Sequence, residues 1–205
     1  MRYARHLLHR RDFEAALGET ERALELDPLA VRTLVGAATV HYGADHLDES
    51  LRLCARAIDL EPACAPAFYF RGFVQVLRQQ WDEALDSMRR SHELAPDHPS
   101  PLSGLGYAYG RAGRRAEALA TIPALQQLKL EGDPRRVSIS LAEVAMGLGD
   151  HVQAIAQLET AFDARVPELV TVACDPIFEP LHSNRQFVEM VHRMGLPLAV
   201  ESTRS

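Results

Sequence analysis

The chain has 205 residues, of which 47% are hydrophobic, and its 28 acidic residues against 22 Lys and Arg residues give a net charge of -6. A chain of this length can bury a full core, whereas a net negative charge disfavours general attraction to nucleic acid or to anionic lipid. No run approaches the roughly 18 consecutive apolar residues that span a bilayer, and the N-terminus lacks the apolar core of a signal peptide. We therefore expect a cytoplasmic protein that binds neither nucleic acid directly nor a membrane.

Basic residues are concentrated at the start of the chain, at Arg2, Arg5, Arg10 and Arg11. The main interpretation of this cluster is a solvated helix face. A contact arm and a fragment of a targeting sequence are the alternatives.

A period of 34 residues organises the next part of the chain. The segments EAALGETERALELDP, ESLRLCARAIDLEP and EALDSMRRSHELAP end at Pro28, Pro62 and Pro96. Apolar residues within each segment fall at helical spacing, and each proline removes a backbone donor and biases the preceding residue away from helix. Because a constant period of this length is typical of helical repeats, each unit is predicted to be two antiparallel helices joined by a short turn.

Two less regular units continue the series, with Gly106 and Ala118 in the fourth and Ala142 and Ala154 in the fifth. Small residues of this kind allow two helices to approach within about 8–10 Å. Pro123 is expected to kink or break the second helix of the fourth unit. The predicted units are residues 1–30, 31–64, 65–98, 99–134 and 135–164, followed by a C-terminal cap at 165–197 and a disordered tail at 198–205.

These residues closely resemble the tetratricopeptide repeat over residues 1 to about 164. The best matches are Gly72, Trp81, Ala84 and Pro96 in unit three and Leu105, Gly106, Tyr109, Gly113 and Ala118 in unit four. Departures from the repeat include Leu34 and Phe68 in place of the usual Trp and Ser50 in place of Ala. The resemblance implies an all-α, right-handed α-solenoid of about five helix-turn-helix repeats with a C-terminal capping helix.

The stretch from Pro167 to Pro197 is not another repeat, and it contains the sequence DPIFEPL followed by a predicted helix from about Asn184 to Met194. It looks like the tail that closes tetratricopeptide arrays in bacterial signalling proteins. In those proteins the array is commonly fused to a DNA-binding, nucleotide cyclase or protein kinase domain. Because the first unit begins partway into its first helix, a segment upstream of this chain is expected. One predicted function is therefore the sensory or interaction half of a signalling or transcription-regulatory protein whose effector domain lies outside this chain.

No arrangement of side chains in the sequence predicts catalysis, a metal site or a cofactor. The glycine-rich segment GLGYAYG lies inside a predicted helix, whereas a dinucleotide-binding loop needs a preceding strand. The histidines lack the spacing of a nucleophile, base and acid, and no pattern of metal ligands recurs on a helix face. The cysteines are odd in number and without CxxC spacing, at Cys54, Cys64 and Cys174. We therefore expect a protein-binding scaffold rather than an enzyme.

In a tetratricopeptide array the first helices of successive units line the concave surface, so the resemblance places the binding residues there. The candidates are the inward-facing positions of these helices, namely Arg32, Val35, Thr39, Tyr42, Tyr69, Phe73, Val76, Ser103, Tyr107, Arg136, Ile139 and Glu143. Apolar and aromatic side chains dominate the set, which favours a partner peptide or helix with apolar anchors. Arg32 and Arg136 near its two ends favour acidic flanks. A competing interpretation is that Tyr69, Phe73 and Tyr107 pack against neighbouring helices and meet no ligand.

Overall fold

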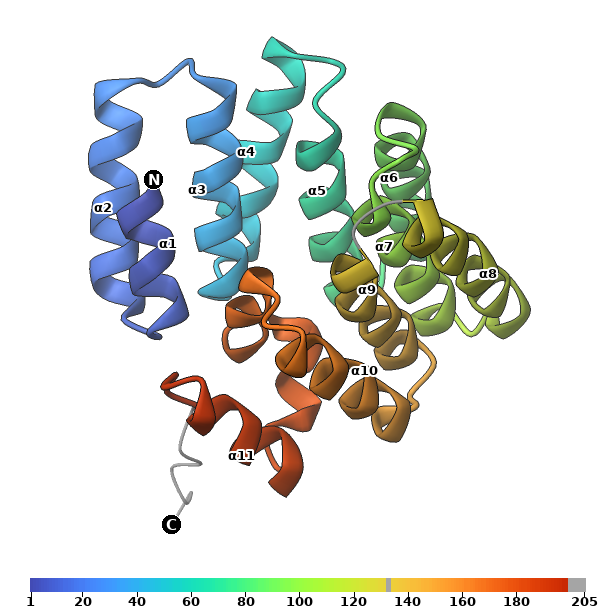
Figure 1. Cartoon of the computed structure of the whole chain (residues 1–205). Coiled ribbons are helices and arrows are strands. Elements are labelled where there is room, and N and C mark those ends of the chain that lie inside the picture. Colours follow the sequence, from blue (N-terminus) through green and yellow to red (C-terminus); the bar gives the residue numbers. More distant parts are fainter. Residues whose placement is uncertain (132–133, 199–205) are drawn as a thin grey trace.

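The computed structural model describes residues 1–131 and 134–198, without the side chains of residues 129–136. Every element of the described residues is helical, and the first ten helices form five antiparallel pairs arranged in a curved array (Figure 1). These helices are α1 (Arg2–His9), α2 (Phe13–Leu26), α3 (Val31–Gly43), α4 (Leu47–Leu60), α5 (Ala65–Leu77), α6 (Trp81–Leu94), α7 (Pro99–Arg111), α8 (Arg115–Glu131), α9 (Pro134–Gly147) and α10 (His151–Asp163). The predicted all-α solenoid is therefore confirmed.

The turn inside each pair has one residue in the left-handed region of backbone space. These residues are Arg11, Asp45, Gln79, Gly113 and Gly149, with φ between 58° and 75°. The first four lie 34 residues apart and the fifth follows after 36, so the turns keep the period of the sequence. Glycine adopts this conformation without a steric cost, and it is present in the last two turns.

Small residues lie where the two helices of a pair cross. Ala4, Ala38 and Ala142 on the first helices and Ala16 and Ala84 on the second helices are at most 1% exposed. Ser50, which replaces an alanine of the repeat, is also fully buried, and its hydroxyl donates a hydrogen bond to the carbonyl oxygen of Ala38 at 2.9 Å. The serine is tolerated because its polar group has a partner.

Helix α8 contains Pro123 and nevertheless runs from Arg115 to Glu131 without interruption. The sequence predicts a kink or a break at this proline, and the predicted break is wrong. Pro123 is exposed on the helix surface, so water can solvate the carbonyl group whose hydrogen bond the proline removes.

The C-terminal segment consists of two short 3-10 helices, η1 (Pro167–Ala173) and η2 (Pro176–Leu181), and of α11 (Arg185–Arg193). Helix α11 packs against α10, whereas η1 contacts α1 and η2 contacts α9. In Figure 1 this orange and red segment lies between the blue first units and α9 and α10. It therefore covers the end of the array and also connects its last unit to its first.

Among the described residues, no helix combines the length and the apolar character that crossing a membrane would require.

Candidate functional site

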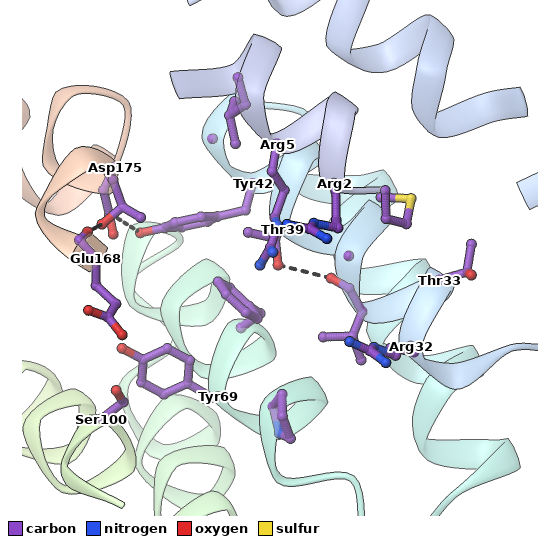
Figure 2. Close-up of a pocket in the computed structure, with 18 of the residues that line it drawn as sticks. Arg2, Arg5, Arg32, Thr33, Thr39, Tyr42, Tyr69, Ser100, Glu168 and Asp175 are labelled. Carbon is purple, nitrogen blue, oxygen red and sulfur yellow. Dashed lines mark hydrogen bonds between the residues drawn. The ribbon is translucent and has the colours of Figure 1, made fainter. Parts of the chain in front are cut away.

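A cavity of about 1420 Å³ lies between the first helices of the array and the C-terminal segment. Helices α1, α3 and α5 supply one wall, and residues of η1 together with Cys174 and Asp175, which follow it, supply the facing wall. Helices α7 and α9 contribute Ser100 and Glu143. Figure 2 shows this region, with Tyr42 and Tyr69 directed toward the wall that carries Glu168 and Asp175. The cavity is open to solvent along α1 and α3, where Arg2, Arg5 and Arg32 are exposed.

The structure brings seven of the twelve predicted site residues into this cavity, and these are Arg32, Val35, Thr39, Tyr42, Tyr69, Phe73 and Glu143. Four others, Val76, Ser103, Tyr107 and Ile139, do not line it. Arg136 belongs to α9, but its side chain lies outside the described residues. The candidate surface is thus limited mostly to units one to three and does not extend along the whole array.

Three of the predicted aromatic side chains are core residues. Tyr42 is 3% exposed, Phe73 2% and Tyr107 1%, and they belong to one hydrophobic cluster. The Phe73 ring centroid lies 5.6 Å from that of Tyr107 and 4.6 Å from that of Tyr69, which meets it edge-on. Tyr69 remains half-buried and lines the cavity. Packing against neighbouring side chains therefore describes Phe73 and Tyr107, whereas Tyr69 is still accessible.

The C-terminal segment contributes apolar side chains to this cluster. Leu169, Val172, Ile177 and Phe178 are at most 2% exposed and belong to the same cluster as Phe73 and the other buried aromatics. The segment thus packs on the inner face of the array. Its own apolar side chains fill part of the surface that the repeat pattern leaves open.

Three arginines lie on the side of the cavity formed by α1 and α3. Arg2 and Arg5 are three residues apart on α1, so they share one helix face, and Arg32 follows near the start of α3. All three side chains are exposed, and within the described residues none of them makes a hydrogen bond or an ion pair through its guanidinium group. In Figure 2 they lie away from Glu168 and Asp175. This side of the cavity is therefore available to an anionic group.

Two carboxyl groups lie on the other side, that of Glu143, which is buried, and that of Asp175, which is half-buried. The hydroxyl of Ser103 donates a hydrogen bond to Glu143 Oε2, and the hydroxyl of Tyr69 lies 3.5 Å from Glu143 Oε1. Asp175 Oδ1 accepts hydrogen bonds from the Tyr42 hydroxyl at 2.9 Å and from the Ile177 backbone N–H at 3.0 Å.

Burial has the largest effect on the pKa of both carboxyl groups. It raises the pKa of Glu143 to about 8 and the pKa of Asp175 to about 6, because apolar surroundings disfavour the charged form. The negative charge of Asp175 raises the pKa of Glu143 further, and the hydroxyl donors oppose the shift only in part. The cavity thus has a cationic side and a carboxyl side.

Arg2, Arg5 and Asp175 belong to recognisable features of the sequence, but those features do not predict a binding site. The first two belong to the basic cluster at the N-terminus, for which a contact arm is one of the alternatives. Asp175 belongs to the DPIFEPL segment, which predicts the end of an array. Only the packing of the C-terminal segment against α1 and α3 brings these residues to one cavity.

The sequence model of the tetratricopeptide repeat matches residues 99–122 and 135–160, which include α7, the first part of α8, and most of α9 and α10. The crystal structure of TTC0263, a thermophilic tetratricopeptide repeat protein of Thermus thermophilus, is similar to this chain with a TM-score of 0.66 and 19% sequence identity, over 95% of this chain and 97% of that one. The crystal structure of MamA is similar with a TM-score of 0.52 and 17% identity, over 80% of this chain and 95% of that one. No curated protein sequence matches the chain. At these identities the solved structures show the fold, which is that of a tetratricopeptide repeat array.

Proposed function

We propose that this tetratricopeptide repeat protein is a scaffold that binds another protein rather than an enzyme, and that it holds a segment of that partner in the cavity between α1, α3, α5 and η1. The cavity itself carries the proposal. Its volume of about 1420 Å³ exceeds the ~300–1,000 Å³ that is usual for small-molecule sites, and suits a peptide of several residues.

An apolar side chain of the partner would be anchored on the α3 and α5 wall. Val35, Tyr69 and Phe70 are half-buried there and line the cavity, so each presents apolar surface to a ligand. Burying one aliphatic or aromatic side chain contributes about 1.5–3 kcal/mol. The anchors expected from the sequence therefore remain part of the proposal, but they contact Tyr69 and its neighbours and not Tyr107.

Acidic residues of the partner would lie near Arg2, Arg5 and Arg32. Exposed ion pairs contribute only about 0.2–1 kcal/mol each, so these arginines act mainly on the orientation of the segment and on its association rate. The acidic residues of the partner that are expected beside Arg32 would thus also lie near two further cationic side chains, both on α1.

The experiment is a selection from a library of random nonapeptides displayed on phage, followed by fluorescence polarisation with the enriched peptides. Tyr69→Ala should weaken binding by about thirtyfold or more, equivalent to ~2 kcal/mol. Tyr3→Ala is the matched control, because Tyr3 is 60% exposed on α1 and does not line the cavity. Failure to enrich any peptide, or equal binding by the wild type and a folded Tyr69→Ala protein, would contradict the proposal.

A further inference from the structure

Two carboxyl groups from distant parts of the chain meet at one end of the cavity. Glu143 comes from α9 and is 7% exposed, whereas Asp175 precedes η2, and both line the cavity wall. Placing a carboxylate in such surroundings costs several kcal/mol unless a cation or several donors compensate the charge.

The chain itself provides these carboxyl groups with neutral donors only. Glu143 has the hydroxyl groups of Ser103 and Tyr69, and the Tyr69 contact of 3.5 Å is at the limit of a hydrogen bond. Both donors of Asp175 are directed at Oδ1. In the described part of the chain, no Lys, Arg or His forms an ion pair with either group. The acceptor capacity that remains on Asp175 Oδ2 and Glu143 Oε1 is thus available to a donor entering the cavity.

Aromatic rings surround the same end of the cavity. Tyr42, Tyr69 and Phe73 line it together with the two carboxyl groups, and the hydroxyl groups of both tyrosines point to a carboxyl. A cation in contact with an aromatic ring gains about 0.5–2 kcal/mol, with the larger values in desolvated places. The two carboxyl groups and the accessible ring of Tyr69 together favour an ammonium or guanidinium group.

We propose that this end of the cavity binds a lysine or arginine side chain of the partner. The inference rests on the proposed function, because it concerns the segment that the cavity would hold. Acidic residues of the same segment would lie at the opposite end, near Arg2, Arg5 and Arg32. A segment with its charges in this order binds in one direction only, since reversal would place like charges together at both ends.

The test is a double-mutant cycle on a peptide selected by the wild-type protein from the random nonapeptide library. Glu143→Gln and Asp175→Asn are combined on the protein, because the amides keep the shape and an acceptor oxygen for Ser103 and Tyr42 but carry no charge. The basic residue of the peptide is replaced by methionine. Glu159→Gln, at an exposed position of α10, is the control for loss of a carboxylate, and circular dichroism checks folding.

We expect each change alone to weaken binding about tenfold and the second change to add little, since both remove the same interaction. Two results would overturn the cationic subsite while leaving the proposed function intact. One is that the selected peptides lack a recurring Lys or Arg. The other is that the peptide and protein changes are additive, while Tyr69→Ala still weakens binding by about thirtyfold. A wild-type protein that selects no peptide would overturn both proposals.

A second measurement separates charge pairing from packing. Because burial raises the pKa of Glu143 to about 8, pairing with a cation at pH 7 requires Glu143 to release its proton. Titration calorimetry in two buffers of different ionisation enthalpy should show this release for the wild type and not for Glu143→Gln. Release of the same size by both proteins would overturn the pairing with Glu143.

Discussion

The hydroxyl of Tyr42 donates a hydrogen bond to Asp175 Oδ1 at 2.9 Å, and this bond joins α3 to the C-terminal segment across 133 positions of sequence. A guanidinium N–H of Arg11 makes a second such connection, to the carbonyl oxygen of Ala173 at 3.0 Å. In an open solenoid each repeat contacts only its neighbours. Here the first units also contact the C-terminal segment, so the stability of the two ends is coupled.

Tyr42→Phe should destabilise the protein by about 1–3 kcal/mol, because it removes a hydrogen bond to the half-buried carboxyl group of Asp175. Urea denaturation followed by circular dichroism measures the change. Tyr3→Phe is the control, since Tyr3 is 60% exposed, and it should alter the free energy of unfolding by less than ~0.5 kcal/mol. Equal effects of the two substitutions would show that the Tyr42–Asp175 bond does not stabilise the closed array.

The contribution of Glu143 to the stability of the protein should fall as the pH rises from about 4.5 to 8. Burial raises the pKa of Glu143 from 4.5 to about 8, so the folded chain holds a proton that the unfolded chain has already released in this interval. The part of the free energy of unfolding that Glu143 contributes therefore decreases with pH across this interval. Asp175, whose pKa is raised to about 6, adds a change of the same sign below pH 6.

Glu143→Gln should remove the larger part of this dependence. The variant has no proton to lose, so relative to the wild type it should gain on the order of a few kcal/mol between pH 5 and pH 9. The titratable groups facing Glu143 are Asp175, Tyr69 and Tyr107, and Arg111 reaches the Tyr107 hydroxyl at 3.3 Å. These groups are unchanged in the variant. Urea denaturation at pH 5, 7 and 9 tests the prediction, with the exposed Glu159→Gln as control, and parallel pH profiles for all three proteins would contradict it.

Helices α7 and α9 come into close backbone contact at Gly110 and Gly147. A Cβ atom on Gly110 would lie 2.4 Å from the carbonyl carbon of Gly147, and neither backbone can yield without moving its helix. Gly110→Ala should therefore destabilise the protein by about 1–3 kcal/mol or more. Gly18→Ala is the matched substitution, since nothing lies within 4 Å of a Cβ there, and it should stabilise α2 by about 0.5–1 kcal/mol. Thermal denaturation compares the two variants. If both are stabilised, or both are destabilised, the contact between the helices does not explain the effect of the substitution.

The five helix pairs could be predicted from the sequence because each depends on its own residues. Pro62 and Pro96 separate successive units, and Ala38 and Ala84 are small where two helices cross, so these patterns report local structure that repeats. The sequence period also shows the two extra residues that precede the fifth turn, at Gly149.

The candidate site could be predicted only in part. Arg32 and Tyr69 line the cavity as the repeat positions imply, but the facing wall of the cavity depends on where the C-terminal segment packs. That contact joins residues as far apart in sequence as Tyr42 and Asp175, and a period of 34 residues contains no information about it. Because the C-terminal segment packs against the first units, Arg2 and Arg5 face a cavity and not bulk solvent alone.

The C-terminal segment offers a last test of coupling between the ends of the array. Phe187 on α11 is fully buried and stacks on His182, with ring centroids 5.7 Å apart. Phe187→Ala should cost about 3–5 kcal/mol in the free energy of unfolding, whereas Val152→Ala, at a position 82% exposed on α10, should cost little.

Hydrogen exchange should then locate the effect. If the C-terminal segment stabilises both ends, Phe187→Ala should accelerate the exchange of amides in η1 and η2 and also in α1 and in α3 near Tyr42. Helix α4, none of whose residues line the cavity, should change less. A terminal cap that protects only its neighbouring unit would instead leave α1 and α3 unchanged and affect α10 alone, because coupling in a linear solenoid decreases with each repeat. Accelerated exchange confined to α10 and α11 would therefore contradict the coupling of the two ends through Asp175 and Ala173.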